Sequence, residues 1–248
     1  MDKALHATWL GRVPYVDAWR MQEAVATRVR DGGAERLLLL EHDPVYTIGR
    51  RGTTDHLLVG PEVLRADGAS VYRVDRGGDI TYHGPGQLVG YPITAFAEGA
   101  DLVAYVRAIE DALRDALSSY GVPSRAEAGK TGVWVDLPNG RPAKIAAIGV
   151  RISRGVTTHG FALNVSTDLA AFDRVLPCGF QHEVASLERL GVAADVSEVG
   201  ERSARALAVR LGRELVVDAS VEPPRDAEIP MEAPVRSALN LLAEPLPA

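Results

Sequence analysis

Apolar residues recur three or four positions apart in three stretches of the chain, which is the spacing of one helix face. The first covers residues 15–30, and Gly32 and Gly33 follow it. The second covers residues 101–120, with Gly121 just beyond its end. The third covers residues 198–211. We therefore predict three amphipathic helices, the second being the clearest because its apolar stripe is continuous over five turns.

Shorter apolar runs predict strands. Residues 35–42 include four successive leucines and are too short for a free helix, so a buried strand is expected. Three β-rich segments follow the second helix, at residues 132–136, 144–152 and 161–165, the first two joined by the Pro138-Asn139-Gly140 turn. These three are expected to be neighbouring, largely antiparallel strands. Residues 214–218 predict a last strand.

The C-terminal segment differs in composition from the rest. Proline is dense in residues 219–248, which argues against regular helix or central sheet there. Neither an internal repeat nor an interdomain linker is visible. We expect one α+β domain over residues 1–218, with a mixed, largely antiparallel sheet flanked by helices, and a mobile or loosely docked tail over residues 219–248.

Charge and composition narrow the class of protein. The net charge of −6 argues against binding nucleic acid, because such proteins gather lysine and arginine. No run of eighteen apolar residues occurs, and residues 1–10 lack the apolar stretch of a signal peptide, so a cytoplasmic protein without membrane attachment is expected. The one cysteine, Cys178, excludes an internal disulfide and a multi-cysteine zinc site.

Four segments carry candidate chemistry. Residues 76–87 place four glycines around Thr81, Tyr82 and His83, and they predict either a ligand-binding loop or a long turn. Lys144 opens an otherwise uncharged strand; its side chain either reaches water from the strand end or meets a functional partner. The third segment, residues 157–165, contains His159, which suits either a core position or a site.

The fourth segment is Pro177-Cys178-Gly179, where the neighbours impose a loop, so the thiol is better suited to being presented than to being packed. Common catalytic motifs are missing. Residues 128–131 resemble the end of a phosphate-binding loop, but Ser124 stands where the earlier glycine is required. Neither a zinc-binding His-Glu-x-x-His helix nor a Gly-x-Ser-x-Gly elbow occurs. Metal and serine-hydrolase functions thus lose support.

Together the four segments resemble the lipoyl(octanoyl) transferases, a family related to biotin and lipoate protein ligases. The matching stretches are Arg-Gly-Gly-x-x-Thr-Tyr-His-Gly-Pro-Gly-Gln, Lys-Ile-Ala-Ala-Ile-Gly-Val, His-Gly-Phe-Ala-Leu-Asn-Val and Pro-Cys-Gly. The resemblance implies a ligase-like catalytic domain, with Cys178 as the acyl-thioester nucleophile and Lys144 as the residue that lowers its pKa. It also implies a supporting role for His159 and an acyl pocket lined by Arg76, Gly77, Gly78, Asp79, Ile80, Thr81, Tyr82, His83, Ala147, Ile148, Gly149, Gly160, Phe161 and Ala162.

The implied reaction moves an octanoyl group from acyl-carrier protein to the lysine of a lipoyl domain, in 2-oxoacid dehydrogenases or the glycine cleavage H protein. No cofactor or metal is expected. Backbone N–H groups near Gly77, Gly78 or Gly149 are candidate oxyanion donors. Acidic partners require a basic face, for which the candidates are Arg50, Arg51, Arg73, Arg76, Arg151 and Arg154. The alternatives are an ATP-dependent lipoate or biotin ligase, which does not need Cys178, and a non-catalytic binder of acyl groups or acyl-carrier protein.

Overall fold

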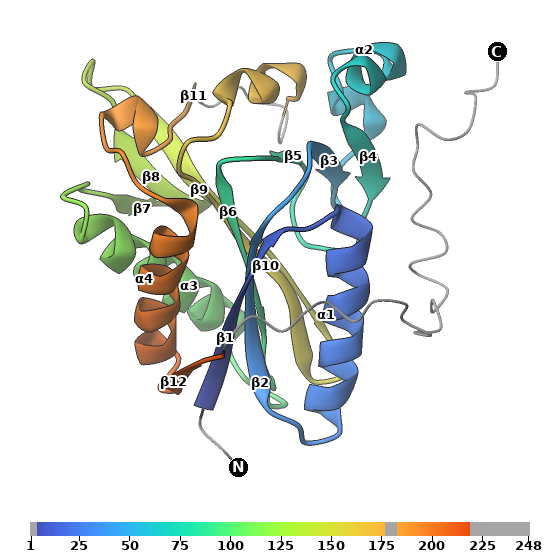
Figure 1. Ribbon diagram of the computed structural model, residues 1–248, viewed down its shortest axis with the longest axis vertical. Coiled ribbons are helices and arrows are strands. Elements are labelled where there is room, and N and C mark those ends of the chain that lie inside the picture. The colour runs from blue at the N-terminus through green and yellow to red at the C-terminus, as the bar shows by residue number, and fades with distance from the viewer. Residues whose placement is uncertain (1–3, 177–182, 219–248) are drawn as a thin grey trace.

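The computed structural model describes residues 4–176 and 183–218, and Figure 1 shows their arrangement. Within these residues a nine-stranded sheet forms the centre, in the order β12-β1-β2-β6-β10-β9-β8-β7, with β11 beside β9. The strands are β1 (Ala4–Arg12), β2 (Glu35–Glu41), β6 (Gln87–Ile93), β7 (Arg125–Glu127), β8 (Lys130–Asp136), β9 (Pro142–Ser153), β10 (Val156–Asn164), β11 (Glu183–Val184) and β12 (Glu214–Val217).

The sheet is mixed and mostly antiparallel. Strand β1 runs parallel to both of its neighbours, and β11 runs parallel to β9. The pairs from β2 through β6, β10, β9 and β8 to β7 are antiparallel. The predicted α+β class with a largely antiparallel sheet is therefore confirmed, as is the adjacency of the three strands after the second helix.

Helices cover both faces of the sheet (Figure 1). Helix α1 (Tyr15–Arg30) packs on one face through Ala18, Met21, Ala26 and Val29. Helices α3 (Leu102–Ser118) and α4 (Val196–Arg210) pack together on the other face over the larger core cluster. The predicted first helix is confirmed at both ends.

Helix α3 begins one residue after the start of its predicted range, because Asp101 caps it, and it ends two residues before the predicted end. The Asp101 carboxylate accepts hydrogen bonds from the N–H groups of Val103 and Ala104, at 2.7 and 3.2 Å. Such a cap satisfies amides that have no partner within the helix. The apolar stripe behind it buries Ile109, Leu113 and Leu117 against the sheet.

Several strands were not predicted from the sequence, namely β1, β6, β7, β11 and the three strands of a smaller sheet. Strand β6 is buried along its whole length and contains Gly90 and Pro92, residues that normally argue against a central strand. Gly90 is required there: a Cβ on it would lie 2.2 Å from the Phe161 ring of β10. The glycine thus lets a large aromatic ring lie across a central strand.

The smaller sheet has the order β4-β3-β5, with β3 (Val45–Ile48), β4 (Ser70–Arg73) and β5 (Ile80–His83). Helix α2 (Pro61–Ala66) and the short 3-10 helices η1 (Thr54–His56) and η2 (Leu169–Arg174) lie near it, and η4 (Glu188–Leu190) follows β11. The glycine-rich segment 76–87 therefore has a strand at its centre and is more than a turn.

Two predictions lie outside the described residues: the loosely docked tail at 219–248 and the placement of Cys178. In the described part of the chain, no helix is both long enough and apolar enough to span a bilayer.

Candidate functional site

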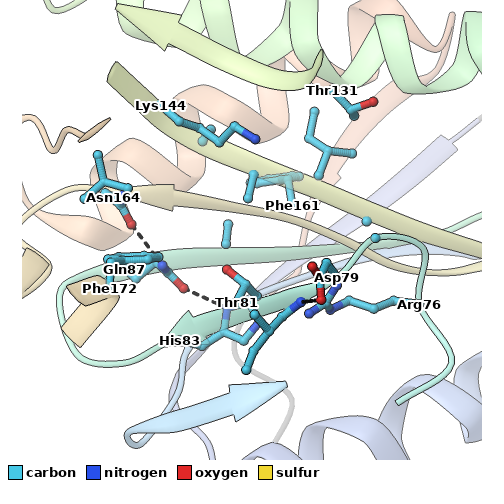
Figure 2. Close-up of a pocket in the computed structure, with 18 of the residues that line it drawn as sticks. Arg76, Asp79, Thr81, His83, Gln87, Thr131, Lys144, Phe161, Asn164 and Phe172 are labelled. Carbon is cyan, nitrogen blue, oxygen red and sulfur yellow. Dashed lines mark hydrogen bonds between the residues drawn. The ribbon is translucent and has the colours of Figure 1, made fainter. Parts of the chain in front are cut away.

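A cavity of about 1350 Å³ opens between strands β9 and β10 on one side and the 76–83 segment on the other. Figure 2 shows Lys144 and Thr131 along one wall, Arg76, Asp79 and His83 across from them, and Phe161 between. The volume exceeds that of an ordinary small-ligand pocket. Of the residues that the resemblance implied for the pocket, those at the cavity are Arg76, Gly77, Gly78, Asp79, Ile80, Thr81, His83, Ala147, Ile148, Gly149, Gly160, Phe161 and Ala162, and Lys144 and His159 join them.

Tyr82 does not line the cavity. Its ring lies 5.1 Å from that of Tyr46 and 5.7 Å from that of Phe172, in the core cluster of the small sheet. Successive side chains of a strand point to opposite faces, so Tyr82 faces away where Thr81 and His83 face the cavity. Burial raises the pKa of Tyr82 to about 12.

Lys144 lies on the wall formed by β9 and β8. Strand pairing places it opposite Trp134, and its ammonium nitrogen lies 4.9 Å from the centre of the Trp134 ring. A second ammonium, that of Lys130, lies 5.1 Å from the same ring. Cation–π attraction holds both amines beside a buried indole at the cavity.

The described chain lies beside η1 before residues 177–182 and beside the Lys144 wall after them. Before them, the N–H of Leu176 donates to the carbonyl oxygen of His56 at 2.9 Å. After them, Val184 of β11 pairs with Lys144, and the N–H of Ala185 donates to the Lys144 carbonyl oxygen at 2.9 Å. Cys178 itself lies outside the described residues, so its partnership with Lys144 stays a prediction.

On the opposite wall, Arg76 is buried and bonded to the protein. Its guanidinium donates to the hydroxyl and carbonyl oxygens of Thr47, at 2.9 and 2.6 Å, and to the carbonyl oxygen of Gly77 at 3.0 Å. The proposed place of Arg76 in a solvent-facing basic surface was wrong, because only 8% of the residue is exposed. Its guanidinium is instead a buried positive charge in the wall of the cavity.

A chain of hydrogen bonds continues from that wall into the sheet. His83 Nδ1 donates to Gln87 Oε1 at 2.8 Å, and Gln87 Nε2 donates to Asn164 Oδ1 at 2.9 Å (Figure 2). Asn164 Nδ2 then donates to the carbonyl oxygen of Ala185 at 3.0 Å. Because the N–H of Ala185 donates to the Lys144 carbonyl oxygen, this series of hydrogen bonds connects the two walls of the cavity.

Buried rings fix the protonation state of the histidines behind this wall. His42 Nδ1 donates to the Val13 carbonyl oxygen, and its Nε2 accepts from the Tyr91 hydroxyl, both at 2.7 Å. Burial lowers the pKa of His42 to about 4. Burial, with the charges of His42 and Arg76, also places the pKa of His83 well below its usual value. Both rings are neutral at pH 7, which suits the expected place of His83 in the lining of an acyl pocket.

His159 occupies an unusual backbone position. Its φ of 56° is rare for a residue other than glycine, and it arises within strand β10. The strained position is supported by two contacts: its N–H donates to Gln22 Oε1, and its Nε2 lies 2.7 Å from Asp75 Oδ1. Burial opposes ionisation of Asp75, but His159 and then Arg151 lower the pKa of its carboxyl.

Of the other candidates for a basic face, Arg50, Arg51, Arg73 and Arg154 are exposed and Arg151 is half-buried. Arg151 pairs with Asp75 at 2.9 Å, and Arg73 donates to the Gly52 carbonyl oxygen. Arg50 and Arg51 are exposed at the cavity, held by backbone N–H bonds to the carbonyl oxygens of Arg76 and Gly78. One oxyanion candidate is also excluded, because the N–H of Gly77 already donates to the Val150 carbonyl oxygen.

Sequence reasoning missed the residues that connect the walls. Gln87 and Asn164 stood inside the recognised motifs without an assigned role, and Thr47, His42 and Tyr91 were not considered. One feature of the sequence could have identified them: they are polar residues within or at the end of strands that are otherwise apolar, and a buried polar group needs a hydrogen-bond partner. Among the described residues, no group of three histidine, cysteine or acidic side chains is arranged to hold a metal ion.

Known proteins resemble this chain in sequence and in fold. Residues 14–208 match the lipoyl protein ligase A/B catalytic domain family. A putative lipoate protein ligase from T. acidophilum, solved with bound lipoic acid, superposes with a TM-score of 0.70 at 21% identity, covering 90% of this chain and 91% of that one. That likeness shows the fold.

Sequence relatives are closer. An octanoyltransferase of Solibacter usitatus is 48% identical over 86% of this chain and 95% of its own length. An octanoyltransferase of Mycolicibacterium gilvum is 44% identical over 88% of this chain and 90% of its own length. With nearly complete coverage of both relatives and the matching catalytic domain, the chain belongs to the octanoyltransferase family of enzymes.

Proposed function

We propose that this enzyme transfers an octanoyl group from acyl-carrier protein, by way of a thioester on Cys178, to the lysine of a lipoyl domain in lipoate biosynthesis. The observation that carries the proposal is Lys144: its amine lies at a large cavity, and the chain that follows Cys178 pairs with it at Val184. Close relatives that are octanoyltransferases supply the acyl group and the reaction class.

In the first step the Cys178 thiolate attacks the carbonyl carbon of the carrier thioester. The new C–S bond forms, the carrier's C–S bond breaks, and the carrier thiolate leaves and takes a proton. A free thiol with a pKa of about 8.5 is only a few per cent ionised at neutral pH. A neighbouring Lys144 ammonium favours the thiolate, and a neutral Lys144 amine accepts the thiol proton; both routes use the same contact.

In the second step the acceptor lysine amine attacks the acyl-enzyme. The C–N bond of the amide forms, the C–S bond to Cys178 breaks, and the proton lost by the amine passes to Lys144 or to the departing sulfur. General-base assistance of this kind contributes about a hundred- to ten-thousand-fold in rate. Since one thioester is exchanged for another before the amide forms, the reaction needs no ATP.

The acyl chain has an apolar part of the cavity available to it. Val89, Ile148, Phe161 and Ala162 contribute to the lining. Each buried methylene stabilises the complex by about 0.8 kcal/mol, so several of them hold an octanoyl chain. Adjacent chain lengths differ by only about 1 to 3 kcal/mol per methylene, which makes length selection modest.

Both protein substrates of such a reaction present acidic surfaces, and the cavity mouth offers positive charge to them. Arg50 and Arg51 lie on one side of the cavity and Lys130 on the other, all exposed. These side chains attract the acidic surfaces of two kinds of partner. The partners are the octanoyl-acyl-carrier protein and the lipoyl domains of 2-oxoacid dehydrogenases or the glycine cleavage H protein.

The test is a transfer reaction without nucleotide. The purified enzyme is mixed with octanoyl-acyl-carrier protein and an apo lipoyl domain, and the intact mass of the lipoyl domain is followed. A mass gain of one octanoyl group without ATP is expected. Strict dependence on ATP would identify a ligase, which shares this fold, and binding of the carrier without any transfer would identify a binding module.

A further inference from the structure

A buried carboxylate lies behind the strand that carries Lys144. Glu110 of α3 is completely buried, and the reaction outlined above gives it no role. Its Oε1 accepts a hydrogen bond of 2.8 Å from the N–H of Gly132 in β8, and its Oε2 pairs with Arg107 on the same helix. A carboxylate is costly to bury, so its partners must be well placed to compensate.

Gly132 is the position at which β8 meets the Lys144 side chain. Its φ is 121°, and a Cβ there would lie 2.5 Å from the Ala146 carbonyl oxygen and 3.4 Å from Lys144 Cε. The lysine stem therefore passes beside the bare Cα of Gly132 on its way to the ring of Trp134. A shift of Gly132 displaces that stem.

The pairing of β8 with β9 is irregular at this place. Val133 pairs with Ala146 while Trp134 pairs with Lys144, so β9 has one extra residue, Ile145. A bulge of this kind bends the strand and redirects a side chain, and it leaves part of the ladder unpaired. The direction of Lys144 thus depends on how firmly β8 is held opposite the bulge.

We propose that Glu110 is a positioning residue for Lys144, because its carboxylate fixes the Gly132 N–H and thereby the bulge that directs the lysine amine to the cavity. The catalytic part of this proposal rests on the proposed function. The competing explanation is a helix-stabilising ion pair. Asp111 and Arg114 form such a pair next to Glu110 and Arg107 on α3, with no hydrogen bond to β8, so they provide a matched control.

The decisive comparison uses four single variants. Glu110→Ala removes the acceptor, Glu110→Gln keeps an oxygen that accepts the Gly132 N–H, Asp111→Ala removes the control ion pair, and Leu113→Ala destabilises the same helix through its core face. The readouts are kcat and KM per folded molecule, with thermal unfolding as the measure of stability.

Glu110→Ala is expected to lower kcat at least ten-fold with KM for the octanoyl-carrier protein within two-fold. Glu110→Gln should recover most of that loss, and Asp111→Ala should match the wild type. Leu113→Ala should lose stability without a comparable loss of kcat. If kcat falls equally in Glu110→Ala, Glu110→Gln and Leu113→Ala, activity follows stability and the positioning role is overturned.

A second variant tests the same contact from the other side. Gly132→Ala places a methyl group against Ala146 and Lys144, so it should also lower kcat at least ten-fold. Because both changes act through one contact, the double variant with Glu110→Ala should be no slower than the slower single variant. Multiplied losses would contradict the shared mechanism.

Hydrogen exchange separates this proposal from the proposed function. Glu110→Ala should accelerate amide exchange in residues 130–136 and 142–147 at least ten-fold, whereas Glu110→Gln should not. This result needs no turnover. Unchanged exchange overturns the positioning role even in an active enzyme, whereas accelerated exchange in a chain without octanoyl transfer supports the role of Glu110 and refutes the proposed function.

Discussion

The two walls of the cavity are built in different ways. The wall of β8 and β9 presents Lys144 from a bulged strand, with its amine beside an indole ring. On the facing wall, the Arg76 guanidinium donates to Thr47 and the His83 ring donates to Gln87, so both side chains are held by other residues of the protein. The first wall therefore offers a group that can exchange a proton with a substrate, and the second offers a fixed shape.

Removal of the Lys144 amine tests the first wall most severely. Lys144→Ala is expected to keep the fold and to lower kcat about a thousand-fold, because both steps lose their proton acceptor or charge partner. Steady-state transfer to a lipoyl domain measures the loss. Lys130→Ala is the matched control, since it removes the other amine from the same ring, and its loss should stay below ten-fold. Equal losses would show that the wall contributes only general charge.

The connection between the walls is tested at Asn164. Asn164→Ala removes one of the two acceptors of the Gln87 amide, which still donates to the Tyr82 carbonyl oxygen, and it removes the side-chain donor to the Ala185 carbonyl oxygen. Stability should therefore fall by about 1 to 3 kcal/mol and kcat about ten-fold. Denaturant unfolding and transfer kinetics provide the two values. Thr157→Val disrupts another buried hydrogen-bond group, that of Thr94, and should cost stability alone. A fully active Asn164→Ala enzyme would show that catalysis does not depend on the hydrogen bonds between the two walls.

The neutral histidines of the second wall predict a dependence of stability on pH. Burial lowers the folded pKa of His42 to about 4, whereas the unfolded chain binds a proton near pH 6.5. The unfolded state therefore gains protons first, and stability falls as pH drops from about 6.5 to 4.

At pH 5 the expected loss from His42 is about 2 kcal/mol relative to pH 7, measured by denaturant unfolding. His42→Gln should show a smaller decrease than the wild type over the same range. An identical decrease in both proteins would contradict a buried, neutral His42.

Tyr82 provides the smallest expected effect. Because its ring packs with Tyr46 and Phe172 away from the cavity, Tyr82→Phe should leave kcat/KM within two-fold of the wild type. Kinetics with octanoyl-acyl-carrier protein check this. A ten-fold loss would return Tyr82 to the substrate pocket that the sequence resemblance implied.

The sequence predicted elements whose signal is local. The first helix follows from apolar spacing alone, and the strand at residues 35–42 from a short leucine run. Strand β6 could not be predicted this way, because Gly90 and Pro92 are acceptable there only through the Phe161 ring and the neighbouring strands. Buried neighbours overrode local preference.

The same limit applies to the site. Motifs gave the residues of the pocket, but not which of them face it, as Tyr82 demonstrates. The contacts of Glu110 with Gly132 and of Gln87 with Asn164 join residues that are distant in the chain, so no spacing rule identifies them. Such pairs depend on strand order and register, which the sequence pattern did not specify.

The central claim is that Cys178 carries the acyl group with Lys144 as its partner. Intact-mass spectrometry after mixing the enzyme with octanoyl-acyl-carrier protein, without acceptor or nucleotide, tests it most directly. The account predicts one octanoyl adduct that hydroxylamine releases, which Cys178→Ala lacks and Lys144→Ala forms much more slowly. A wild-type enzyme that transfers octanoyl groups without forming this adduct, or an adduct that persists in Cys178→Ala, would contradict it.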